Sequence, residues 1–115
     1  MGVTSYKMFM TYDHRVSDSF IAKVMEIVGA NGGVVQLHAE NGDVIEHLMN
    51  KAMKEGRTKP SDFPGTCPPW AEAEAINRGI LLGAMTDCII HSTSFNKAWI
   101  KSYQTGTTTR ATCVD

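Results

Sequence analysis

Short apolar runs alternate along this chain with longer segments in which apolar residues recur at helical spacing. Residues 5–10 are mostly apolar and predict a strand. Ser17-Asp18 is a suitable helix start, and the apolar residues that follow recur with the 3.6-residue period of a helix. The glycine-containing stretch 29–33 is expected to end that helix. Residues 34–38 are rich in β-branched side chains and predict a second strand.

The same alternation continues in the middle of the chain. The sequence Asn41-Gly42-Asp43 predicts a turn that caps another helix, and Gly56 is expected to end it. Residues 57–68 are polar and contain prolines, so they predict a loop.

A third helix and a third strand are predicted in the last part of the chain. Pro68-Pro69 is expected to begin a helix that continues to about residue 85. Residues 88–91 predict a short strand, and Thr93 or Ser94 is expected to cap a short helix that reaches about residue 103.

The predicted order of elements, β-α-β-α-α-β-α, indicates an α/β fold with a parallel sheet and right-handed crossovers. Buried parallel strands need neighbours on both sides, whereas the outer two of three strands would be edges. We therefore predict a partial (β/α)8 TIM barrel of about three parallel strands with flanking helices. Residues 1–104 are expected to be a central segment of the barrel domain, and residues 105–115, which are low in apolar content, a weakly structured or eroded tail.

Composition and charge exclude several classes of function. The net charge of -1, from 11 basic and 12 acidic residues, leaves no large basic field for nucleic acid. No apolar run approaches the roughly 20 residues of a membrane span, and the N-terminal sequence is not that of a signal peptide. The three widely spaced cysteines favour a reducing compartment, so we expect a cytoplasmic protein.

Three polar residues lie in or at the end of the three predicted strands: Lys7, His38 and His91. The carboxyl ends of parallel strands face the same way, and α/β barrels keep their active sites there. The three residues are therefore a candidate metal site. Taken one at a time, a histidine at a strand end is more often a hydrogen-bonded structural residue than a metal ligand, and Lys7 is more often a side chain that extends from a sheet edge into water.

Taken together, four stretches resemble the dihydropyrimidinase/hydantoinase family of the amidohydrolase superfamily. The order and spacing of the strand lysine and the two histidines also fit that family. The run HAENGD is specific, and the resemblance covers about residues 2–100. The four stretches are TSYKMFMTY at 4–12, VVQLHAENGD at 34–43, PPWAEAEA at 68–75 and IIH at 89–91.

The resemblance implies a metal-dependent hydrolase that opens cyclic amides, such as dihydropyrimidines or hydantoins, with two divalent metal ions, usually zinc. It implies that carbon dioxide carboxylates Lys7, that the carbamate bridges the two metals, and that His38 and His91 bind one of them. It implies further that Tyr12 hydrogen-bonds the substrate carbonyl oxygen as this oxygen gains negative charge, while metal-activated water attacks the ring. A homo-oligomer, a tetramer in the family, is expected of the full-length chain.

The sequence also departs from the family pattern, in ways that predict an incomplete site. The family's His-x-His pair and its later metal-binding Asp have no counterpart here, Cys67 stands where Arg is usual, and Trp70 where an acidic residue is common. We expect about half of a two-metal site, in a fragment of a longer product or a truncated one, with little or no activity alone.

Three alternatives to that interpretation remain. The first is a non-catalytic protein resembling the collapsin response mediator proteins, although those lack the Lys and the second His, which are both kept here. The second is another cyclic-amide hydrolase, such as an allantoinase. The third is a degenerate fragment without function.

Overall fold

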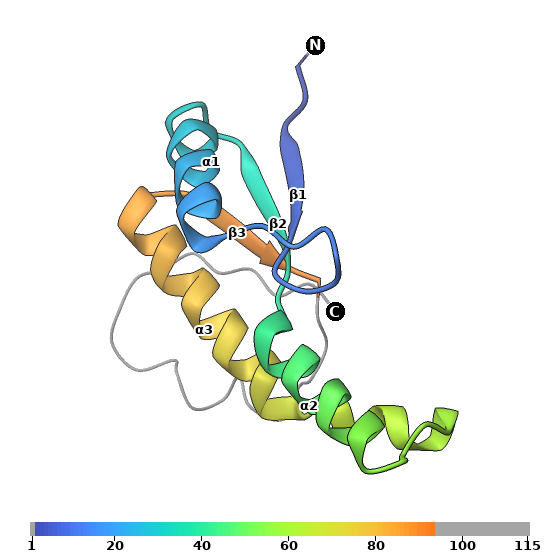
Figure 1. Ribbon diagram of the computed structural model, residues 1–115. Helices are drawn as coiled ribbons and strands as arrows, with labels where there is room; N and C mark the ends of the chain where they lie inside the picture. Colours follow the sequence, from blue (N-terminus) through green and yellow to red (C-terminus); the bar gives the residue numbers. More distant parts are fainter. Residues whose placement is uncertain (1, 94–115) are drawn as a thin grey trace.

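The computed structural model describes residues 2–93 as a three-stranded sheet with two long helices packed against one of its faces (Figure 1). Helices α1 and α3 contact each other and the sheet, whereas α2 packs mainly against the short helix η1 and extends away from the sheet. In chain order the elements are β1 (Ser5–Phe9), α1 (Asp18–Ala30), β2 (Val34–His38), α2 (Gly42–Lys54), η1 (Pro60–Thr66), α3 (Pro69–Thr86) and β3 (Ile89–Ser92).

All three strands are parallel, in the order β1-β2-β3. Each neighbouring pair is joined through at least one helix, as parallel pairing requires. The parallel α/β arrangement predicted from the alternation of apolar runs is therefore confirmed, and the strands begin and end within one residue of the predicted positions.

The core lies between the sheet and helices α1 and α3. Val35 and Leu37 of β2 are 0% and 1% exposed, and they meet Ile21 and Met25 of α1, which are both fully buried. Helix α3 contributes a row of small buried residues four positions apart. At Gly79, a Cβ would lie 2.8 Å from Cδ1 of Leu37, so a larger residue there would require the Leu37 side chain to move. The row consists of Ala71, Ala75, Gly79 and Gly83.

The loop expected at 57–68 contains the 3-10 helix η1, so that prediction was wrong in part. Pro60 at its first position has the backbone angle that a helix start needs, and the Asp62 carboxylate accepts a hydrogen bond from the Lys59 N–H at 3.1 Å. The short helix expected to end near residue 103, and the tail 105–115, lie outside the described residues.

No helix among residues 2–93 is long and apolar enough to cross a membrane.

Candidate metal and substrate site

The candidate metal-binding residues share the face of the sheet that the helices leave open. The strand register pairs Lys7 with Gln36, and Gln36 with His91, so these three residues form one row across the sheet. Their neighbours along the strands, such as Leu37, are buried against the helices. Because successive side chains of a strand point to opposite faces, the row points away from the helices. His38 pairs with Phe9 and lies on the same face, two positions beyond Gln36.

His38 ends β2 and has two polar partners. Its Nε2 lies 2.7 Å from a carboxylate oxygen of Glu40 and 3.3 Å from the hydroxyl of Tyr12. The Phe9 ring stacks on the imidazole, with 5.6 Å between ring centroids and 21° between planes. These contacts hold the imidazole at the carboxyl end of the sheet, where α/β folds place their ligands. Glu40 belongs to the motif recognised in the sequence, but no role was predicted for it.

Lys7 is exposed on the open face. Its ammonium lies 5.3 Å from the centroid of the Phe9 ring, which is within the range of a cation–π contact. The side chain reaches water from β1, which lies at an edge of the described sheet.

Tyr12 has an unusual backbone conformation. Its φ is 67°, in the left-handed region that side chains other than glycine rarely adopt. Such conformations persist only where surrounding contacts enforce them, and they gather at functional sites. Burial raises the pKa of the Tyr12 hydroxyl above its ordinary value of 10.0, and the nearby Glu40 and Cys67 raise this pKa further. The phenol therefore keeps its proton, and it is a hydrogen-bond donor at neutral pH.

His14 contacts the rings of Phe9 and Tyr12. Its ring meets Phe9 edge-on at 4.4 Å and stacks with Tyr12 at 5.7 Å. Its position in a loop gave no periodic signal, so the sequence did not indicate these contacts.

Gly42, the first residue of α2, contacts the loop between β1 and α1. Its N–H donates to the Met10 carbonyl at 3.2 Å. A Cβ on Gly42 would lie 2.8 Å from that oxygen and 2.9 Å from the Thr11 Cα. This close approach explains why the motif has glycine between Asn41 and Asp43.

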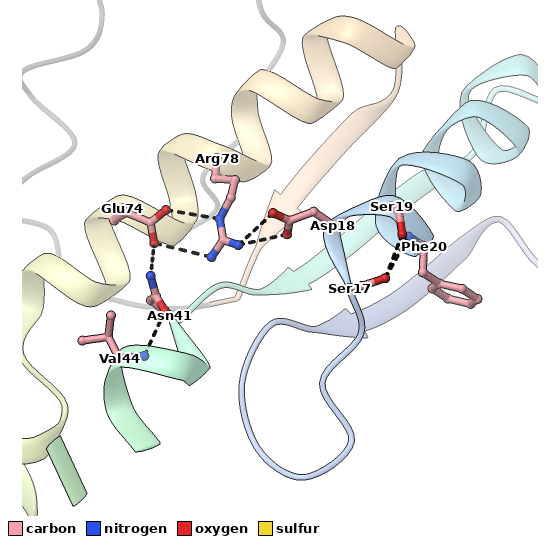
Figure 2. A network of polar contacts seen from close by, with 8 residues as sticks. All are labelled: Ser17, Asp18, Ser19, Phe20, Asn41, Val44, Glu74 and Arg78. Carbon is pink, nitrogen blue, oxygen red and sulfur yellow. Dashed lines mark hydrogen bonds and ion pairs between the residues drawn. The ribbon is translucent and has the colours of Figure 1, made fainter. Parts of the chain in front are cut away.

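A polar network connects the first turns of α1 and α2 with α3 (Figure 2). Asn41 caps α2, because its side-chain oxygen accepts from Val44 N–H at 3.1 Å, and its amide donates to Glu74 at 2.7 Å. Arg78 pairs with the same Glu74 at 3.2 Å and with both oxygens of Asp18, at 2.9 and 3.0 Å. The network fixes the helix ends that surround the carboxyl edge of the sheet.

The two described cysteines differ in environment. Cys88 is 6% exposed and belongs to the core, and burial raises the pKa of its thiol above the ordinary 9.0. Cys67 is partly exposed and lies near enough to Tyr12 to affect the pKa of its hydroxyl. Both are free thiols.

Among residues 2–93, no three His, Cys, Asp or Glu side chains lie close enough together to hold a metal ion. The open face does offer imidazoles of His38 and His91 and the Lys7 amine, and a carbamate on that amine would add anionic oxygens. This donor set suits zinc, although it is incomplete without further ligands. An open hollow of about 310 Å³ lies elsewhere, between α2 and η1, and none of these three residues lines it.

No protein-family model matches the sequence. Individual proteins do match it. The D-hydantoinase of Geobacillus stearothermophilus is 39% identical over 83 residues, which are 70% of this chain and 18% of the relative. Human dihydropyrimidinase-related protein 5 is 34% identical over 92 residues, which are 78% of this chain and 16% of the relative. The chain thus spans about a fifth of the length of the curated relatives it matches.

Solved structures agree with the sequence matches. The crystal structure of dihydropyrimidinase from Brevibacillus agri superimposes with a TM-score of 0.76 and 39% sequence identity, and the match covers 78% of this chain and 20% of that one.

Proposed function

Because this chain is homologous to one segment of the dihydropyrimidinase/hydantoinase family, we propose that it supplies part of the active site of a cyclic-amide hydrolase. The observation that carries the proposal is the common open face of Lys7, His38 and His91, with the Tyr12 hydroxyl beside His38. The proposed substrates are dihydropyrimidines, hydantoins or close relatives. The surrounding strands of a (β/α)8 barrel, a tetrameric assembly and a cytoplasmic location are parts of the same proposal.

Lys7, His38 and His91 are the proposed ligands of two divalent metal ions, most simply zinc. Carboxylation of Lys7 would form a bond between its neutral amine nitrogen and the carbon of carbon dioxide, with loss of one proton from the nitrogen. The product is an anion, and its two oxygens can bind two metals. Two metal ions at such a site supply Lewis-acid stabilisation and a nucleophile at neutral pH.

Tyr12 is the proposed catalytic residue of this segment. Its raised pKa keeps the phenol protonated, so it can donate a hydrogen bond to the carbonyl oxygen of a substrate amide. That bond becomes stronger as the oxygen gains negative charge, which stabilises the transition state more than the bound substrate. Phe9 and His14 pack against the phenol ring and limit its movement.

The proposal is tested with a chimera in which this chain's matching segment replaces the corresponding residues of the Geobacillus stearothermophilus D-hydantoinase. Ring opening of hydantoin and dihydrouracil is measured with zinc and bicarbonate present. We expect activity that Tyr12→Phe reduces and Lys7→Ala abolishes, whereas Lys23→Ala on the exposed side of α1 leaves it unchanged. A folded chimera whose activity is indifferent to Lys7→Ala contradicts the proposal. Turnover of allantoin alone would favour an allantoinase instead.

A second candidate function is a non-catalytic one, because dihydropyrimidinase-related protein 5 also matches this chain. Metal content separates the two candidates. A chimera that folds, binds no metal and opens no ring would favour the non-catalytic function.

A further inference from the structure

Arg15 connects the loop that carries Tyr12 to the first turns of α2. Its Nη2 lies 2.6 Å from a carboxylate oxygen of Glu46 and 3.1 Å from one of Asp43. Its aliphatic stem lies on Gly42, where a Cβ would come within 2.8 Å of the Arg15 Cδ. The side chain is 33% exposed. Its apolar stem packs on Gly42, and its guanidinium pairs with the two carboxylates.

The same residue holds the backbone of Tyr12. The Tyr12 carbonyl accepts a hydrogen bond from Arg15 N–H at 3.2 Å and another from Arg15 Nη1 at 3.4 Å. Since a φ of 67° is unfavourable for tyrosine, contacts of this kind must compensate for it. Arg15 is the residue that joins Tyr12 to α2 through both backbone and side chain.

We propose that Arg15 is a positioning residue, which holds Tyr12 in its left-handed conformation and thereby keeps the phenol against His38. The placement of the Tyr12 phenol beside His38 does not depend on the proposed function. Its importance for catalysis does rest on that function. The guanidinium suits this task because its planar fork can bind the two carboxylates and the carbonyl at once. Lysine, with one ammonium group, is expected to retain the ion pairs only in part.

The test is the nuclear Overhauser cross-peak between the ring protons of Tyr12 and His38 in the 115-residue chain. The two ring centroids are 5.2 Å apart, so a cross-peak is expected in the wild type. Arg15→Ala should abolish it while circular dichroism shows an intact fold, and Arg15→Lys should restore part of its intensity. The matched control is Arg57→Ala. Arg57 pairs with Glu55 at 2.7 Å and is remote from Tyr12 in the sequence, so its removal should leave the cross-peak unchanged.

An unchanged cross-peak in folded Arg15→Ala would overturn the proposal, as would equal loss in Arg57→Ala. If Arg15→Ala does not fold, Glu46→Gln decides, because it weakens the shortest ion pair without removing the stem. It should then reduce the cross-peak, and no change would count against the proposal. The cross-peak needs neither metal nor substrate, so an inactive chimera with an intact cross-peak would contradict the proposed function alone.

Discussion

Gly42→Ala tests whether the loop after β1 depends on close contact with the start of α2. The new Cβ would lie 2.8 Å from the Met10 carbonyl oxygen and 2.9 Å from the Thr11 Cα, well inside ordinary van der Waals contact. Both are backbone atoms, so the loop itself must move. Overpacking of this kind costs about 1–3 kcal/mol, and loss of the hydrogen bond from Gly42 N–H to Met10 adds about 0.5–1.5 kcal/mol. The better helix propensity of alanine offsets at most about 1 kcal/mol, so a net loss of about 0.5–4.5 kcal/mol is expected.

The assay is urea unfolding followed by far-ultraviolet circular dichroism, with Gly65→Ala as the matched control. A Cβ on Gly65 would have nothing within 4 Å, so its substitution should leave stability unchanged or raise it by about 0.4–1 kcal/mol. If Gly42→Ala is as stable as the Gly65→Ala control, the close approach does not hold the loop, and our explanation of this glycine is refuted.

Four further predictions concern the core, the thiols, the phenol and activity. Leu37→Ala should destabilise the chain by about 2–5 kcal/mol in the same urea assay, because it leaves a cavity beneath α3; a loss typical of a surface site would contradict this. Cys67 should react with a disulfide reagent in the folded chain, whereas Cys88 should react only after unfolding, as peptide mapping would show; equal rates would contradict this. The Tyr12 ring-carbon resonance should titrate above pH 10, because the pKa of the hydroxyl is raised in the folded chain. The stability that the neutral phenol contributes should be complete below the pKa of the unfolded chain and lost as pH rises through the raised pKa of the folded chain. Titration at or below pH 10 would refute this. The isolated chain with zinc and bicarbonate should show little or no opening of hydantoin, and a metal-dependent rate well above that of Lys7→Ala would contradict this.

Much of the fold was predictable because its signals are local. The β-branched run of β2 and the helical period of α1 depend on neighbours in the chain, and the predicted cap at Asn41 forms as expected. Helix η1 was missed, since a polar stretch with prolines resembles a loop unless the Asp62 bond to Lys59 is foreseen.

The candidate site was predictable only in part. The common direction of the strand ends predicted a shared site from the sequence, whereas the strand register shows that Lys7, His38 and His91 share one face of the sheet. The left-handed backbone of Tyr12 and the ring contacts of His14 arise from tertiary packing in a loop. No periodic pattern in the sequence predicts them. Arg15 was missed for the same reason, because its carboxylate partner Glu46 is remote in the sequence.

The proposed metal site is tested most directly by the metal content of the chimera with D-hydantoinase, measured by elemental analysis after growth with zinc. We expect about two zinc ions per chain, as in a two-metal site, with marked loss in Lys7→Ala and in His38→Ala but not in Lys23→Ala. A correctly folded chimera that keeps its full zinc content without Lys7 and without His38 would contradict the claim that this face of the sheet binds metal.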